Sequence, residues 1–399
     1  MSNLQCKRSN IEHIFRNDEG IEALCCKMHS NALIGSNELS EIRQQLIDGH
    51  RPAMCSVCWN NEDRNLESWR QLGNKIYNNS NLYKKIEIIF DNTCDSKCIY
   101  CSAVYSSQWD QEIKNTKFKV PKFACKTQVI SNKNNTQYIL DFVNRVGKEV
   151  PFGKTTEIVL LGGEPLLTTI NKKNMLEACV NSFYENNNKD NVLTVILQTN
   201  CNTPEPILNK IIKNIKEYQK LYPNLVVDVS VSAESIGKNY EYVRYGSSYD
   251  RFVKNLETWI REGFWISSNM SINAISLIDT KKYFELFVEL GKKHNITAQV
   301  YANLVYNPKE LSIGLLDNNF EYYLTDASLY VQKHKTIFRN YNKVCNNLKS
   351  FTSFIGTDKT YIPALIETIE YFKLQRGVDL KSVNEPLYNY LYNTDLLIQ

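Results

Sequence analysis

The chain has 399 residues, which is enough for one large α/β domain with additions or for two domains. Its 47 lysines and arginines against 43 aspartates and glutamates give a net charge of +4, too mild to indicate a nucleic-acid or membrane-surface partner. No apolar run approaches the roughly 18 residues of a membrane span, and residues 1–15 lack the apolar core of a signal peptide. We therefore expect a cytoplasmic protein with no membrane partner.

The amino-terminal region, residues 1–84, is rich in cysteine and shows no clear strand pattern. In a long chain without a secretion signal, clustered cysteines are more often metal ligands than disulfides. The C-x2-C pair of Cys55 and Cys58, joined by a second pair at Cys25 and Cys26, is enough to bind four-coordinate zinc or a 4Fe-4S cluster. Cys6 is a fifth candidate. A second 4Fe-4S cluster, structural zinc and free thiols all stay open here.

Short β-rich runs alternate with longer helical segments between residues 85 and 306. We expect strands at 85–91, 156–163, 192–200, 225–233, 265–276 and 297–305. Near-continuous apolar strands separated by amphipathic helices favour a mainly parallel sheet covered by helices. Six such units predict an α/β fold, a partial (β/α)6 TIM-like barrel, because two repeats of the closed eight-fold barrel are missing.

The carboxyl-terminal residues, 307–399, are helical and aromatic in character and form a predicted helical extension. Their tyrosines and phenylalanines are consistent with core and cap packing, the reading we favour, or with a substrate-binding appendage. The region contains a single cysteine, Cys345.

A cysteine triplet, Cys94, Cys98 and Cys101, follows the apolar strand at 85–91 directly. Four cysteines would close a zinc site or a fully ligated iron-sulfur cluster. Three thiolates on a 4Fe-4S cluster leave one iron free to bind a small molecule. The triplet also stands at the carboxyl end of the first barrel strand, where barrel active sites are built. A zinc site that recruits a distant fourth ligand is the alternative.

The spacing Cys94-x3-Cys98-x2-Cys101, with Tyr100 before the last cysteine, resembles the signature of the radical S-adenosylmethionine (radical SAM) enzymes. A second motif, "GGEP", ends the next strand with Gly162, Gly163, Glu164 and Pro165. Glycines at a strand end let backbone approach a ligand closely, and Glu164 supplies a carboxylate acceptor. The resemblance implies that this loop binds the amino group of the SAM methionine moiety.

Two later stretches extend the resemblance. "LQTNC" is similar to the third-strand Thr-Asn-Gly element of the family and contains Asn200, with Cys201 where glycine is common. "VSVSAESIGKNYEYVRYG" resembles a fourth-strand stretch of the subgroup with SPASM or twitch extensions. The resemblance implies that Ser230, Ser232, Glu234 and Arg244 lie at the carboxyl edge of the sheet and belong to the SAM site. The serine hydroxyls and the arginine guanidinium would hold the SAM ribose and carboxylate.

For some of these residues the sequence leaves two roles open. Glu234 stands where the family pattern usually has aspartate. Arg244 either binds a carboxylate or forms a surface ion pair, and Tyr100 either lies against the adenine or packs beside the loop. "CSVCWNNEDRNLESWRQLGN" resembles a lead-in of twitch-containing relatives. SPASM and twitch extensions carry their extra cysteines after the barrel, whereas this chain has only Cys345 there.

The resemblance implies an enzyme that cleaves SAM reductively at a 4Fe-4S cluster and uses the 5′-deoxyadenosyl radical to abstract hydrogen from a substrate. We expect flavodoxin or ferredoxin as electron donor and a peptide or protein as substrate. A small metabolite or nucleoside is the nearest enzymatic alternative. Two non-catalytic alternatives are a zinc-binding nucleic-acid interaction module and a degenerate barrel that binds SAM without turnover.

Overall fold

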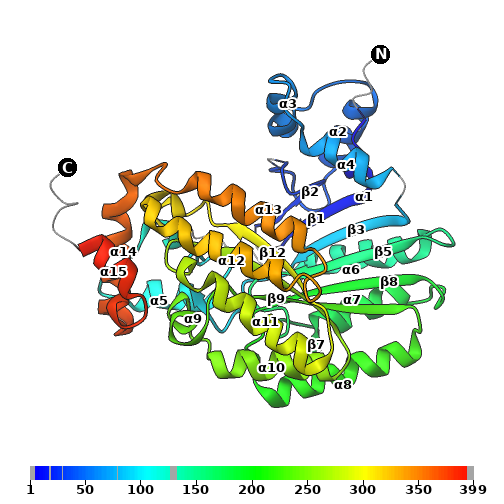
Figure 1. The fold of residues 1–399 in the computed structure, drawn as a ribbon. Coiled ribbons are helices and arrows are strands. Elements are labelled where there is room, and N and C mark those ends of the chain that lie inside the picture. The colour runs from blue at the N-terminus through cyan, green and yellow to red at the C-terminus, as the bar shows by residue number, and fades with distance from the viewer. Residues whose placement is uncertain (1–4, 18, 29, 79, 126–132, 393–399) are drawn as a thin grey trace. The chain divides into compact units, whose positions relative to one another are not determined.

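The computed structural model describes residues 5–17, 19–28, 30–78, 80–125 and 133–392. The chain forms two compact units, shown within the ribbon of Figure 1. The first comprises Met1–Thr93, Gln128–Gln198 and Pro206–Asp228. The second comprises Cys94–Thr127, Thr199–Glu205 and Val229–Gln399.

All six strands expected from the sequence are present. They are β3 (Leu82–Ile89), β5 (Thr155–Leu161), β8 (Val192–Thr199), β9 (Leu225–Ser232), β11 (Trp265–Ile272) and β12 (Gln299–Leu304). The sheet has eight strands in the order β12-β11-β9-β8-β5-β3-β1-β2. From β3 to β12 this order follows the sequence, with helices in the connections, as a partial (β/α)6 barrel requires. The predicted α/β fold class is confirmed.

Two strands come from the Cys-rich region, where the sequence shows no strand pattern. β1 (Glu12–Arg16) pairs parallel to β3, and β2 (Ile21–Ala23) pairs antiparallel to β1. Glu12 and His13 are both buried, so β1 lacks the apolar alternation that predicts a strand. The buried His13 has a polar partner, because its Nε2 lies 3.1 Å from Oε2 of Glu22 on β2.

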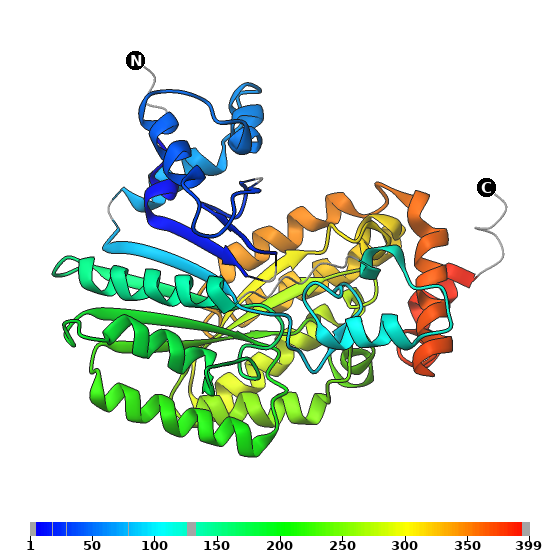
Figure 2. The ribbon, with the colours of Figure 1, turned by 180° about the vertical axis from the view of Figure 1, so that it is seen from behind.

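Helices α6 (Lys133–Glu149), α7 (Met175–Tyr184) and α8 (Glu205–Leu221) run alongside the strands of the first unit (Figure 2). Asn144 of α6 donates a hydrogen bond to the Ser182 carbonyl of α7 at 2.9 Å, and Asn181 of α7 bonds Tyr218 of α8 at 3.0 Å. Their apolar faces cover fully buried strand residues such as Ile158, which is paired with Val195.

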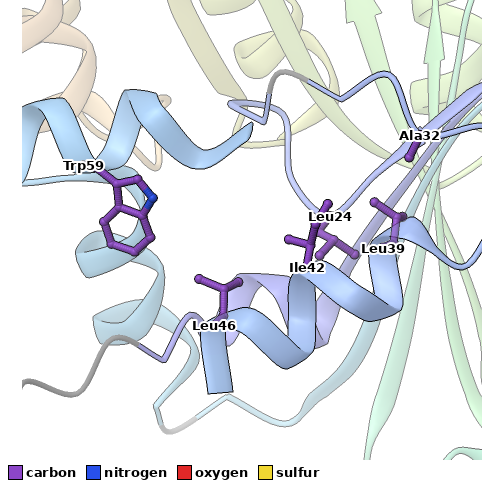
Figure 3. Close-up of a cluster of buried hydrophobic side chains, with 6 residues drawn as sticks. All are labelled: Leu24, Ala32, Leu39, Ile42, Leu46 and Trp59. Atoms are coloured by element: carbon purple, nitrogen blue, oxygen red, sulfur yellow. The ribbon is translucent and has the colours of Figure 1, made fainter. Parts of the chain in front are cut away.

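The amino-terminal region contains four short helices: α1 (Lys7–Ile11), α2 (Glu38–Ile47), α3 (Ser56–Glu62) and α4 (Trp69–Tyr77). The apolar stripe of α2 forms a small core with α3 and the chain after β2, shown in Figure 3. This core consists of Leu24, Ala32, Leu39, Ile42, Leu46 and Trp59. The region therefore has a packed interior of its own.

The second unit is mostly helical. It holds α5 (Ser107–Asn115), α9 (Gly237–Val243), α10 (Tyr249–Arg261), α11 (Thr280–His294), α12 (Glu321–Lys333), α13 (Tyr341–Phe351), α14 (Ile362–Arg376) and α15 (Glu385–Tyr392). In the carboxyl-terminal extension Phe320 and Phe372 are buried, as core packing requires, whereas Tyr322 is exposed. No helix among the described residues is both long enough and apolar enough to cross a membrane.

Candidate functional site

The cysteine triplet lies in the second unit on a loop that is tied into a short ladder. β4 (Lys97–Cys98) pairs antiparallel with β10 (Arg244–Tyr245), which sets Arg244 directly opposite Cys98. Cys98 is buried, while Cys94 and Cys101 are half-buried. The backbone N–H of Cys101 donates a hydrogen bond to the carbonyl of Cys98 at 3.0 Å, which closes a turn. This turn links Cys98 to Cys101, and Cys94 lies on the same loop, four residues before Cys98.

Side chains around the start of α5 hold this loop in place. Ser107 accepts a hydrogen bond from the Cys94 N–H at 3.1 Å and donates to the Cys94 carbonyl at 3.2 Å. The indole N–H of Trp109 donates to the Cys98 carbonyl at 2.9 Å. Ser106, the N-cap of α5, donates to the Ser96 carbonyl at 2.6 Å. These contacts hold the loop in its conformation.

Burial raises the pKa of two thiols of the triplet. It raises the pKa of Cys98, against the opposing charge of Arg244, and it raises the pKa of Cys101 to about 12. Metal ligation would displace these protons. In the part of the chain that the structure describes, no three Cys, His, Asp or Glu side chains already stand close enough to hold a single metal ion.

Arg244 lies at the centre of a buried polar network. Its Nε is 3.1 Å from Oε1 of Glu234 and its Nη2 is 2.7 Å from Oε2, which is a two-point pairing of guanidinium and carboxylate. Nη2 also donates to the Tyr100 hydroxyl at 2.6 Å, and that hydroxyl donates to Glu234 at 3.1 Å. Nη1 points to Sγ of Cys98 at 3.8 Å.

The Arg244 network is not the surface ion pair weighed from the sequence, because Arg244 is 4% exposed and Glu234 is fully buried. Burial alone would lower the pKa of Arg244, but the charges of Glu234, Tyr100 and Cys98 raise it. Burial raises the pKa of Tyr100. The arginine is therefore a fixed positive charge beside a cysteine of the triplet.

Asn200 also holds the cysteine loop. Its amide donates to Asp95 at 2.6 Å and to Ser96 at 3.2 Å, two residues inside the triplet. Ser96 bonds Ser247 at 2.7 Å. Gly246 has φ +97°, and a Cβ there would meet the Asp95 carbonyl at 2.8 Å. Sequence reasoning missed Asp95, Ser96 and Gly246 as loop contacts, although the glycine two residues after Arg244 was the available signal.

Ser230, Ser232 and Cys201 lie on or just after strands, in the second unit. Ser230 on β9 accepts a hydrogen bond from Asn269 on β11 at 2.9 Å, and Ser232 is half-buried. Cys201, which replaces the common glycine, has φ +58° and is 1% exposed. That left-handed backbone explains why glycine is favoured at this position.

The "GGEP" loop belongs to the first unit and packs on the chain that leads to the triplet. A Cβ on Gly162 would meet the Asp91 carbonyl at 2.9 Å, and one on Gly163 would meet the Thr93 carbonyl at 2.1 Å. The Glu164 N–H donates to the Thr93 carbonyl at 2.6 Å, and the Glu164 carboxylate accepts from the Leu166 N–H at 3.1 Å. Glu164 and Pro165 are buried. The two glycines therefore permit close contact with residues 91–93, which are bonded directly to Cys94.

The sequence profile described as the Radical SAM superfamily matches residues 88–290, half of the chain. The chain belongs to the radical SAM superfamily. The matched residues include the triplet, the "GGEP" loop and every other residue of the predicted SAM site. A search of curated proteins finds no match.

Similarity to solved radical SAM structures is low. A structure titled native anSMEcpe with bound AdoMet and Cp18Cys peptide is 12% identical, covers 62% of this chain and 59% of its own, and has a TM-score of 0.40. Streptococcus suis SuiB bound to precursor peptide SuiA is 14% identical, with coverage of 77% and 54% and a TM-score of 0.36. HydG, a maturase of the [FeFe]-hydrogenase, is 12% identical, with coverage of 88% and 92% and a TM-score of 0.35. The chain thus spans about three fifths of anSMEcpe and about half of SuiB.

The amino-terminal cysteines lie outside the radical SAM match. Cys55 and Cys25 are half-buried and Cys58 is buried, whereas Cys26 is exposed. Burial raises the pKa of Cys25 and Cys55 to about 12, and the neighbouring thiol of Cys6 adds to both shifts. Cys6 therefore lies near both Cys25 and Cys55.

Two cysteines outside the triplet and the amino-terminal region are packed in helices. Cys179 is fully buried in α7 of the first unit, as its apolar helical pattern predicts. Cys345 is buried in α13 of the second unit, where its thiol donates to the Ser328 carbonyl of α12 at 3.5 Å. Cys345 thus has a packing role in the carboxyl-terminal helices.

Proposed function

We propose that this chain is a radical SAM enzyme whose 4Fe-4S cluster is held by Cys94, Cys98 and Cys101. The observation that carries the proposal is the triplet on one pinned loop, inside a superfamily match over half of the chain. The donor set fits such a cluster, because three thiols from one loop leave the fourth iron open for SAM. When bound, the cluster supplies the electron that cleaves SAM reductively to the 5′-deoxyadenosyl radical.

The protein's own contribution is to position the cysteine loop and to bind SAM. Arg244 presents an N–H to Cys98 and is locked by Glu234, so we assign both as positioning residues. Asn200 fixes the chain between the first two cysteines. Tyr100 bonds both members of the ion pair, which favours packing beside the loop over stacking on the adenine.

The SAM-binding assignments rest on the family resemblance. We propose that Gly162, Gly163, Glu164 and Pro165 form the turn that binds the methionine amino group. The buried Glu164 carboxylate already accepts a backbone N–H, so it shapes the turn. Ser230 and Ser232 are the proposed hydroxyl ligands of the ribose and carboxylate. Of these two, Ser232 is the more accessible.

We propose a peptide or protein as substrate, through membership of the SPASM/twitch-type subgroup that the fourth-strand stretch resembles. An exposed aromatic pair supports a large substrate. Tyr306 follows β12 by two residues, is 54% exposed, and its ring lies 5.6 Å from that of Phe354, which is 38% exposed. Exposed aromatic rings are common anchors in interfaces with peptides and proteins. A small metabolite or nucleoside is the alternative substrate.

Three further assignments complete the proposal. The electron donor is flavodoxin or ferredoxin, because SAM cleavage needs a low-potential electron. The location is cytoplasmic, where such donors and reduced cysteines occur. The amino-terminal cysteines hold a second metal group, a 4Fe-4S cluster or zinc.

The test is SAM cleavage by anaerobically reconstituted protein. We expect 5′-deoxyadenosine in the presence of dithionite and none without a reductant. Peptides encoded beside the gene should accelerate its release, and deuterium from a labelled peptide should enter the nucleoside. Tyr306→Ala should raise the peptide concentration needed, without changing the slow release seen with no substrate. Acceleration by nucleosides or metabolites alone would replace the peptide assignment.

A further inference from the structure

A hollow in the amino-terminal region is lined by four cysteines from three separate segments. Cys6 stands before α1, Cys25 follows β2, and Cys55 and Cys58 lie at the start of α3. They are four of the eleven lining residues, and with its open mouth the hollow contains about 340 Å³ of free space. We propose that these four thiols ligate a second 4Fe-4S cluster and that Cys26 is not a ligand.

Cys26 is excluded by its direction. It is adjacent to Cys25 in sequence, yet it does not line the hollow and its side chain is exposed. The exposed thiol of Cys26 therefore faces away from the space that the other four surround.

Cys6 takes the fourth place because α4 and α1 hold its segment against the hollow. Arg70 of α4 donates to the Gln5 carbonyl at 3.1 Å, and Asn74 donates to the same oxygen at 2.8 Å. Ser9 of α1 donates to the Cys6 carbonyl from its hydroxyl at 2.7 Å. α4 is itself fixed by a capping box between Ser68 and Gln71. The position of Cys6 is therefore set by structure on both sides of it.

The other lining residues suit a buried anionic group. Met28, Leu46, Trp59 and Trp69 supply an apolar wall, and Leu46 and Trp59 belong to the small core of Figure 3. Arg8, Lys27 and Arg70 add positive charge. Arg8 also pairs with Glu12, and Arg70 pairs with Glu62. A cluster bound by four thiolates would carry net negative charge, which Lys27 and the two paired guanidinium groups would offset in part, and the apolar wall would limit water access.

The geometry favours a cluster over a single zinc ion. Zinc draws four sulfurs to about 2.3 Å from one point, so a zinc site needs no internal space. Here the four cysteines surround a hollow. A cubane of four irons and four sulfides would take one thiolate ligand from each of four cysteines arranged in this way.

The test isolates this site from the triplet. Anaerobic reconstitution of the Cys94→Ala, Cys98→Ala, Cys101→Ala variant should leave about four irons and four sulfides per chain, with the absorbance of a 4Fe-4S cluster. Adding Cys6→Ser should remove them, whereas adding Cys26→Ser should not. Alkylation followed by mass spectrometry checks the ligands without relying on the folding of variants. The loaded triple variant should protect Cys6, Cys25, Cys55 and Cys58, while Cys26 reacts.

Each other outcome overturns part of the inference. If the triple variant binds zinc and no iron, the site is a zinc site and not a cluster. If Cys26→Ser removes the iron and Cys6→Ser does not, Cys26 is a ligand and Cys6 is not. A triple variant without metal would refute the second site and leave the triplet's assignment intact. If instead the triplet holds no cluster, which would refute the proposed function, the triple variant should contain as much iron as the unmodified chain.

Discussion

The guanidinium of Arg244 lies against the sulfur of Cys98, with Nη1 3.8 Å from Sγ, and the two residues are paired across β4 and β10. Glu234 fixes the other two guanidinium nitrogens. The backbone pairing and the ion pair thus hold one positive charge beside a proposed cluster ligand. This relationship lets the role of Arg244 be tested separately as structural support and as an influence on the metal.

Removing one partner of the ion pair should destabilise the protein strongly. Arg244→Met leaves the carboxylate of Glu234 buried without its main partner, which should cost about 3–5 kcal/mol of unfolding free energy. Replacing both residues, as Arg244→Met with Glu234→Leu, should recover much of this loss because no charge is left buried. Anaerobic urea denaturation of the metal-free variants measures the difference. A double variant as unstable as the sum of the single variants would contradict the coupling.

The hydrogen bond to Cys98 should raise the reduction potential of the radical SAM cluster. Arg244→Lys keeps the charge but loses the fork that directs an N–H to sulfur. Hydrogen bonds to cluster sulfurs favour the reduced state. We expect the midpoint potential to fall by on the order of 60 mV, equivalent to about 1.4 kcal/mol for one electron. Spectroelectrochemistry of the reconstituted variant measures it, with Arg251→Lys as control. An equal or higher potential would count against the contact.

Adding a methyl group at Gly163 should disturb the start of the cysteine loop. The Cβ would lie 2.1 Å from the Thr93 carbonyl, which is backbone and must shift. We expect Gly163→Ala to cost about 1–3 kcal/mol through overpacking and to lower the iron content. Gly153→Ala is the matched control, because Gly153 has φ +76° and open space around a Cβ. Its cost should be only the left-handed strain of about 1–2 kcal/mol, with iron unchanged. Equal iron content in both variants would refute the steric role.

A buried carboxylate of α5 predicts a pH dependence of stability in the acid range. Glu112 lies 3.2 Å from Arg376 of α14 and 2.6 Å from Lys97, and it accepts from the Tyr371 hydroxyl at 3.0 Å. Burial alone would raise the pKa of Glu112, but the charges of Arg376 and Lys97 lower it below the ordinary value of 4.5. The unfolded chain therefore binds the proton first as the pH falls.

Stability from Glu112 is fully present above pH 4.5 and is lost as the pH falls toward the lower pKa of the folded state. Below pH 4.5 the unfolding free energy of the unmodified chain should fall more steeply than that of Glu112→Gln. One proton accounts for up to about 1.4 kcal/mol per pH unit. Urea titrations at several pH values give the two slopes. Parallel slopes would mean that Glu112 contributes nothing to the acid response.

The strands of the barrel could be predicted because each is a β-rich run between helical segments, and some are almost continuously apolar. β5, for example, buries Ile158, Val159 and Leu160 in succession. β1 could not be predicted, since it is short and its buried Glu12 and His13 also depend on distant partners, the Tyr77 hydroxyl that donates to Glu12 and the Glu22 carboxylate beside His13. Local pattern carries no information on such partners.

The triplet could be recognised from its spacing because its three cysteines lie within eight residues of the chain. The partners of that loop were harder to read. Arg244 and Glu234 reach it through the pairing of β4 with β10, a contact 146 residues apart in sequence. The sequence also favoured Cys26 over Cys6, because proximity in the chain suggested a pair, whereas the fold turns only Cys25 into the hollow.

The most direct test of the proposed function compares two cysteine variants during SAM cleavage. Cys98→Ala removes a proposed cluster ligand, whereas Cys345→Ala removes a buried thiol that packs in α13. After anaerobic reconstitution with reductant and SAM, we expect 5′-deoxyadenosine from the unmodified chain and from Cys345→Ala, and none from Cys98→Ala. The iron content of Cys98→Ala should be lower by about four. Undiminished nucleoside release by Cys98→Ala would contradict the assignment of the triplet as the radical SAM centre.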